Sequence, residues 1–229
     1  MYRTLYKINR YTPILMIWVE GNEKSQFYAD RTEASWKRAG YTNVKRISGT
    51  TPETLEGIFE FTKNRTYPSG RVRNWNDVEF AIWESHYKAW EMASRCRSGA
   101  IIIEHDAMFY QGARIPRGTN LYPLYSLGVS KGKQKGTYSC IAAAAYWIWP
   151  TVAESFMQFK NETIAGPVDG YIHAYEPWYP RSPISIEYAR QRLPVKHFID
   201  PKVGTIKKNL LEVYNNEKHN ISSVRGEEE

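Results

Sequence analysis

The first fifty residues alternate short apolar runs with a helix-length polar segment, and this order restricts the folds open to the chain. The run ILMIWV at 14–19 is the length of a buried strand. Residues 20–40 have the pattern of a helix that ends at Gly40, where a left-handed cap forms easily. VKRIS at 44–48 is typical of a second strand. A strand, a helix and a strand at this spacing predict a βαβ unit in an α/β domain with a mostly parallel central sheet.

A second helix and another buried strand are predicted further along. Asn76 or Asp77 can cap a helix that extends to about Arg95. Apolar side chains cover so much of its circumference that we expect it to be well buried. The segment SGAIIIEHDAMF at 98–109 is typical of a strand inside a sheet, with its acidic residues at the carboxyl end. In open α/β sheets that end faces the ligand crevice.

The second half of the chain has weaker local signals. We expect a basic loop, GVSKGKQKGTYSC at 128–140, that leads into a strand, and a helix over 150–160. The pattern favours one domain over 1–205, followed by a C-terminal helix and a flexible acidic tail over 206–229.

Composition limits the classes of partner and compartment. The net charge of +7 favours an anionic partner, which could be nucleic acid, a phosphorylated ligand or an anionic membrane. Two cysteines do not suggest a disulfide framework, and we expect a cytoplasmic protein. No apolar run approaches the roughly 20 residues of a membrane-spanning helix. A phosphate-binding P-loop, a dinucleotide fingerprint and a zinc-type cysteine spacing are not found in the sequence.

The acidic end of the segment at 98–109 is the strongest candidate site. If the strand continues through it, Glu104 and Asp106 point to one face and His105 to the other. Two carboxylates at the rim of a crevice suit Mg²⁺ or Mn²⁺, with water and phosphate oxygens completing the shell. From this segment alone, a solvated strand end that happens to be acidic is an equal alternative.

Several segments resemble the signature of glycosyltransferase family 25, which includes lipopolysaccharide and collagen galactosyltransferases. EFAIWESHYKAW at 79–90 resembles the family's Ser-His-x-x-x-Trp helix, and the strand that follows resembles its Glu-Asp-Asp strand, with His105 at the middle position. GTYSCIAAAAY at 136–146 and GPVDGYI at 166–172 look like a Gly-Thr-x-Tyr strand and a Pro-Val-Asp element. RISGTTPETL lies where the family has a strand that ends in Gly. The resemblance covers about residues 14–173.

The resemblance implies a single GT-A-like, Rossmann-like domain that transfers a sugar, with inversion, from a nucleoside diphosphate to a hydroxyl. UDP is the expected nucleotide. Asp106, supported by Glu104, would hold Mn²⁺ or Mg²⁺ at the diphosphate. Asp169 would take the proton of the acceptor, although an Asp that stabilises an ordinary turn is the alternative.

The remaining expected roles concern donor binding and support of the motif. An arginine of the first helix could approach the donor phosphates, although a solvated arginine is the commoner case. The expected donor-binding residues are Arg31, Glu104, His105 and Asp106, and the expected motif-supporting residues are Ser85, His86 and Trp90. For His86, an ordinary hydrogen-bonded core histidine is an equal alternative.

Basic residues interleaved with aromatic ones suggest the acceptor. Lys131, Lys133 and Lys135 alternate with other residues in a glycine-containing segment, as in a loop that follows a phosphate backbone. The preferred acceptor is a hydroxymethylated base in DNA, as in bacteriophage DNA-modifying enzymes, which would act in the host cytoplasm. The alternatives are a lipopolysaccharide or other surface glycan and, in a different class, a non-catalytic nucleic-acid-binding module.

Overall fold

The structure is a computed structural model. It describes residues 8–56, 64–66, 72–74, 76–109, 114–115, 119, 124–131, 137–158, 168, 172, 184–185 and 195–197. The elements in the first half of the chain are β1 (Ile14–Trp18), α1 (Glu23–Arg38), β2 (Val44–Ser48), the 3-10 helix η1 (Pro52–Thr54), β3 (Asn64–Thr66), β4 (Val72–Asn74) and α2 (Asp77–Ser94). Those in the second half are β5 (Ala100–Glu104), β6 (Ala107–Phe109), β7 (Leu124–Lys131), β8 (Thr137–Ile148), α3 (Pro150–Gln158), β9 (Ile184–Ser185) and β10 (Val195–His197).

One mixed sheet organises these elements, in the order β2-β1-β5-β8-β7-β10-β6, with β9 beside β8. β1 is parallel to both β2 and β5, whereas β8 is antiparallel to β5 and to β7. The α/β class is therefore confirmed, but the sheet is mixed rather than mostly parallel. The short connection between β7 and β8 accounts for their antiparallel pairing, since parallel neighbours need a crossover of a dozen or more residues.

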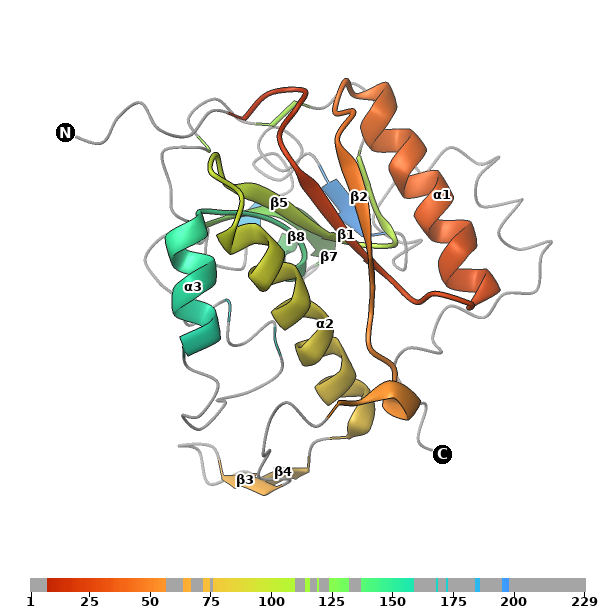
Figure 1. The fold of residues 1–229 in the computed structure, drawn as a ribbon, viewed down its shortest axis with the longest axis vertical. Helices are drawn as coiled ribbons and strands as arrows, with labels where there is room; N and C mark the ends of the chain where they lie inside the picture. The colour runs from red at the N-terminus through yellow and green to blue at the C-terminus, as the bar shows by residue number, and fades with distance from the viewer. Residues whose placement is uncertain are drawn as a thin grey trace.

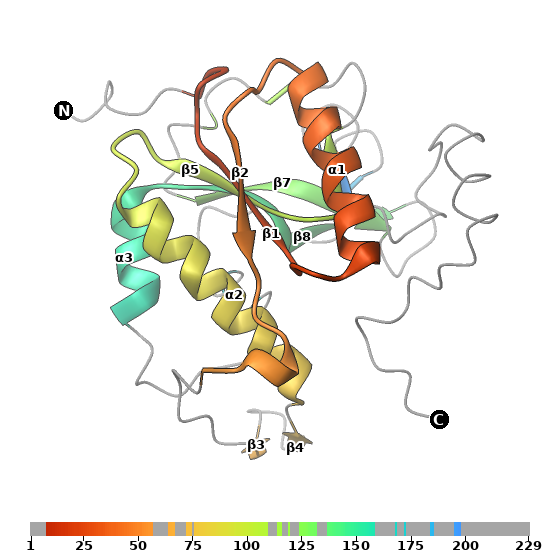
Figure 2. The same cartoon turned by 45° about the vertical axis from the view of Figure 1, so that its right-hand side comes forward.

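Helices cover both faces of this sheet (Figure 1). α1 lies on one face, and α2 and α3 lie together on the other, as the rotated view also shows (Figure 2). Among the helices that the structure describes, none combines the length and apolar character needed to cross a membrane.

Capping residues mark the ends of both long helices, and the sequence predicts those at Gly40 and Asn76, whereas the cap at Asn22 was not predicted. The Asn22 side chain accepts a hydrogen bond from the Ser25 N–H at the start of α1, and Gly40 follows its C-cap with φ of 93°. Asn76 caps α2 and forms a capping box with Glu79. The predicted bounds of these two helices are confirmed to within a few residues.

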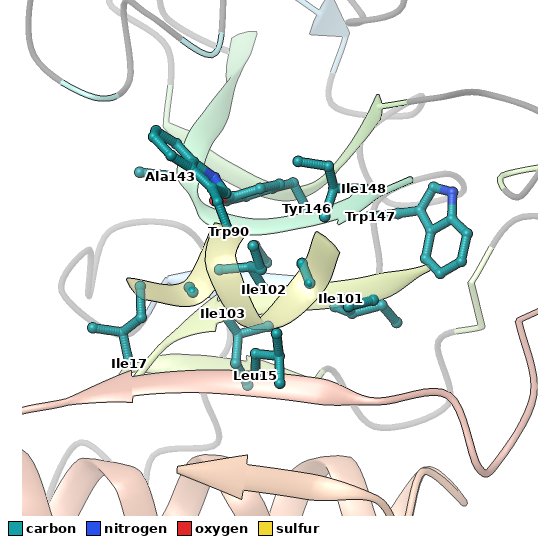
Figure 3. Close-up of a cluster of buried hydrophobic side chains, with 14 of the residues drawn as sticks. Leu15, Ile17, Trp90, Ile101, Ile102, Ile103, Ala143, Tyr146, Trp147 and Ile148 are labelled. Carbon is teal, nitrogen blue, oxygen red and sulfur yellow. The ribbon is translucent and has the colours of Figure 1, made fainter. Parts of the chain in front are cut away.

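The core lies around β5, which is apolar on both sides because helices cover both faces. Ile101, Ile102 and Ile103 are fully buried, and Trp147 and Tyr146 of β8 are also fully buried beside them. Figure 3 shows the three isoleucines of β5 between β1 and Tyr146 of β8. The strand predicted at 98–109 is thus confirmed as a central strand from Ala100 to Glu104.

The basic loop predicted at 128–140 is strand at both of its ends, in β7 up to Lys131 and in β8 from Thr137. Residues 128–131 belong to β7, whose pairing with β8 runs from Leu124 to Lys131. The register shifts between Ser126 and Gly128, which indicates that this glycine marks an irregularity in a strand rather than the start of a loop. Residues 132–136 lie outside the described part of the chain.

Charged side chains join β2 to α1 near the start of the fold. Arg46 donates hydrogen bonds to Asp30 at 2.6 Å and to Glu33 at 2.7 and 2.9 Å. The hydrogen bond from Arg46 lowers the pKa of Asp30. Burial raises the pKa of Glu33, but hydrogen bonds from Lys37 and Arg46 outweigh it and leave the pKa below its ordinary value.

Candidate functional site

The strand order places a topological switch point between β1 and β5. From β1 the chain passes through α1 to β2, and it then returns through α2 to β5 on the other side of β1. In open α/β sheets, ligands bind outside the carboxyl ends of the strands at such a point. The carboxyl ends of β1 and β5 are Trp18 and Glu104. The acidic segment therefore lies at the carboxyl ends of the parallel strands, where a ligand is expected.

The acidic segment itself changes structure in its middle. β5 ends at Glu104, His105 and Asp106 form a turn, and β6 begins at Ala107 on the way to the opposite edge of the sheet. Strand alternation therefore does not extend to Asp106, and the argument that placed both carboxylates on one face by alternation is wrong. The side chain of Glu104 is 25% exposed, whereas Asp106 is only 2% exposed.

Ser85 of α2 fixes the chain that leaves β2. Its hydroxyl accepts a hydrogen bond from the Thr50 N–H at 2.8 Å and donates one to the Ala81 carbonyl at 2.7 Å. A Cβ at Gly49 would lie 3.2 Å from both the Ser85 hydroxyl and the Trp18 carbonyl. The close approach of α2, β1 and this turn thus favours glycine at position 49.

Replacement of Ser85 by Ala is expected to destabilise the protein by about 1–3 kcal/mol, because the buried Thr50 N–H loses its acceptor. Urea denaturation measures the change. Ser94→Ala is the matched control on the same helix, since the exposed Ser94 hydroxyl donates to the Glu91 carbonyl of its own helix. We expect that control to stay within about 0.5 kcal/mol of the wild type. Equal losses in the two variants would contradict this role for Ser85.

A buried hydrogen-bonded group connects α2 to β8 and faces the acidic strand end. His86 Nδ1 lies 2.9 Å from the Tyr146 hydroxyl oxygen, and Trp90 Nε1–H donates to the same oxygen at 2.8 Å. His86 and Trp90 are 1% and 0% exposed. His86 Nε2 lies 3.6 Å from Glu104 Oε1. The predicted motif residues His86 and Trp90 are thus joined with Glu104 through one cluster.

Sequence reasoning missed Tyr146, which holds this cluster together. Ile102 of β5 is paired with Tyr146, and Glu104 lies two residues further along the same strand. Residues directly opposite in a sheet share a face, as do alternate residues of one strand. The only sequence signal was a tyrosine after four alanines, in the segment quoted for its Gly-Thr-x-Tyr pattern.

Glu84, next to Ser85, is a second carboxylate that sequence reasoning missed. It is 1% exposed, and both of its oxygens lie 3.2–3.3 Å from the Glu56 N–H. Lys88, one turn further along α2, forms an ion pair with the Glu56 side chain at 3.1 Å. Together these contacts hold the segment after η1 against α2, near the carboxyl ends of the parallel strands.

The two remaining predicted donor-binding residues lie beside aromatic rings of α1. The Arg31 guanidinium stacks over the Phe27 ring at 4.0 Å, and the His105 ring lies 6.1 Å from the Tyr28 ring. Phe27 and Tyr28 are adjacent and in edge contact. Arg31 and His105 therefore contact neighbouring positions of one helix.

Other predicted residues cannot be placed. Asp169, Lys133 and Lys135 lie outside the described residues, and of Lys131 only the backbone is described, in β7. The C-terminal helix and tail predicted at 206–229 also lie outside them.

The side chains at this site supply only some of the ligands that a divalent ion needs. Glu104 and Asp106 supply the hard oxygen ligands that Mg²⁺ and Mn²⁺ prefer. Within the described part of the chain, however, no group of three or more His, Cys, Asp or Glu side chains is arranged to hold a metal ion. An ion bound by these two residues would take its other ligands from water and from the substrate, as Mg²⁺ does in nucleotide sites.

Comparisons with known protein families and with curated proteins identify no relative of this chain. No protein-family model matches the sequence, and no curated protein matches it significantly.

Proposed function

We propose that this protein is a GT-A-like, metal-dependent glycosyltransferase. It would move a sugar from a nucleoside diphosphate, most simply UDP, to a hydroxyl acceptor with inversion. The observation that carries the proposal is the contact between segments that resemble separate parts of one family signature. Ser85 contacts Thr50, and His86 contacts both Tyr146 and Glu104, at the carboxyl edge of the sheet.

The burial of the acidic residues favours a site over a solvated strand end. A solvated end would leave both carboxylates in water, because burial of a charge is costly. Asp106 is instead 2% exposed and Glu104 is 25% exposed at its side chain. This arrangement supports a role for the two acids that requires them at fixed positions.

Glu104 and Asp106 are the residues that would hold the ion. A bound divalent cation offsets the negative charge that develops on the leaving diphosphate, which is worth several kcal/mol of the barrier. Asp169 remains our candidate for the group that accepts the proton of the attacking hydroxyl. The proposal assigns no role in proton transfer to His86, which is buried behind Glu104.

Our preferred acceptor is a hydroxymethylated base in DNA, on the strength of the net charge of +7 and the lysines near the β7–β8 connection. If DNA binds there, Lys131, Lys133 and Lys135 contact phosphates and release counterions. The triple Lys→Ala variant is then expected to bind duplex DNA more weakly at low salt, with the log-log salt slope reduced by about one unit for each lost contact. Binding of UDP should stay unchanged, which serves as the internal control.

Transfer itself tests the proposal. The protein is incubated with UDP-sugars, Mn²⁺ and either hydroxymethylated DNA or a surface glycan, and UDP release is followed. Release stimulated by DNA supports the preferred acceptor, and release stimulated only by glycan identifies the alternative. DNA binding without UDP release from any UDP-sugar would contradict the enzyme proposal and favour a non-catalytic nucleic-acid-binding module.

A further inference from the structure

A tyrosine on β8 and a carboxylate on β5 lie on either side of one buried imidazole. Tyr146 is 0% exposed, and its ring stacks on that of His86 at an angle of 22°. On the other side of the imidazole, Nε2 lies 3.6 Å from Glu104 Oε1. Figure 3 shows Tyr146 extending from β8 toward Trp90 of α2, above the isoleucines of β5. The cluster is therefore built from three elements that the core holds in place.

The indole of Trp90 restricts how the Tyr146 hydroxyl can orient. An indole N–H is only a donor, so the Tyr146 oxygen is its acceptor at 2.8 Å. With that hydrogen directed at the oxygen, the hydroxyl can in turn donate to His86 Nδ1, which lies 2.9 Å away. In this arrangement Nδ1 is the acceptor, and Nε2 is the ring nitrogen that carries the hydrogen.

The protonated Nε2 would face Glu104. This nitrogen is buried and makes no hydrogen bond within the described part of the chain. A separation of 3.6 Å is longer than a hydrogen bond. At this separation the Nε2–H dipole still attracts the carboxylate electrostatically.

We propose that Tyr146, oriented by Trp90, is a positioning residue that acts through the His86 imidazole to hold the Glu104 carboxylate at the donor site. The inference rests on the proposed function, because the position of Glu104 matters only if that carboxylate serves the bound donor. It assigns a role to Tyr146, and it gives Trp90 a purpose beyond packing. Partners of this kind behind a metal ligand typically change metal affinity by about 10- to 100-fold when they are removed.

The first test needs no ligand. ¹⁵N spectra of the histidine rings in the full chain are expected to show His86 as the Nε2–H tautomer. In Tyr146→Phe, which removes only the hydroxyl, that preference should be reduced or lost. A His86 that carries its proton on Nδ1 in the wild type overturns the proposal.

The second test measures Mn²⁺ binding in the presence of UDP by electron paramagnetic resonance. Tyr146→Phe is expected to weaken binding by about 10- to 100-fold. His86→Gln, whose amide can donate from a place close to Nε2, should bind more tightly than His86→Leu. In the His86→Gln background Tyr146→Phe should have little further effect, since residues that act through one another are not additive.

Tyr41→Phe is the matched control. Tyr41 is partly buried against Trp36 and Phe109, and it precedes β2 at the opposite end of the parallel strands. The Tyr41→Phe variant should leave Mn²⁺ binding unchanged.

If Tyr146→Phe also binds Mn²⁺ and UDP as the wild type does, the inference is overturned while the proposed function stands. If the wild type shows no Mn²⁺-dependent binding of UDP, the proposed function fails, and the role of Tyr146 in positioning Glu104 fails with it. The ¹⁵N spectra then still decide whether Tyr146 sets the tautomer of His86.

Discussion

Asp106→Asn and Glu104→Gln are each expected to lower kcat/KM for sugar transfer by about 100-fold or more. Each change removes a negative oxygen ligand while it keeps the size of the side chain. The loss of an ion at the diphosphate costs several kcal/mol of transition-state stabilisation, and each 1.4 kcal/mol is about a factor of ten in rate. Initial rates of UDP release over a range of Mn²⁺ concentrations measure the effect.

The burial of Asp106 makes a folding control necessary. Circular dichroism and thermal denaturation should show that both variants keep the fold. Glu91→Gln is the matched control for activity, because Glu91 is an exposed acid near the far end of α2 that pairs with Arg95. It should retain the wild-type rate. Folded Asp106→Asn and Glu104→Gln variants with near wild-type turnover would exclude the proposed ion site.

Gly99→Ala is expected to destabilise the protein by about 3 kcal/mol or more. Gly99 joins α2 to β5 with φ of 80°, a left-handed conformation that costs other residues about 1–2 kcal/mol. The added Cβ would lie 2.5 Å from Trp147 Cη2 and 2.9 Å from the Ile148 carbonyl. Overpacking of a core adds about 1–3 kcal/mol. Urea denaturation measures the sum.

Gly40→Ala separates the backbone cost from the steric cost. Gly40 has φ of 93°, and a Cβ there would meet no atom within 4 Å. Only the conformational cost of about 1–2 kcal/mol is then expected. The difference between the two variants isolates the contact with Trp147. Equal destabilisation would mean that the indole and β8 can shift to accept a methyl group at position 99.

Local signals predict the elements whose bounds depend on neighbouring residues. Gly40 marks the end of α1 and Asn76 marks the start of α2, because caps act within one turn of a helix. The strand at 100–104 follows from its apolar run. The antiparallel position of β8 beside β5 depends instead on contacts far apart in sequence, which a pattern within one segment does not contain. Gly128 was misleading for a similar reason, since only pairing with β8 identifies it as part of a strand.

The candidate site could be predicted in part. Its acidic residues were visible from their place after a buried apolar run, and His86 was visible because its segment resembles a known signature. The burial of Asp106 was not, because it depends on a turn that sends β6 to the far edge of the sheet. Tyr146 was missed because its role follows from its pairing with Ile102, which places it beside α2.

Titration of UDP into the protein, with and without Mn²⁺, tests the central claim most directly. Isothermal titration calorimetry measures the dissociation constant without any assumption about sugar or acceptor. Our account predicts binding of UDP that requires Mn²⁺ and is lost in Glu104→Gln. Absence of UDP binding in the presence of Mn²⁺, or binding that is equally tight in a folded Glu104→Gln variant, would contradict it.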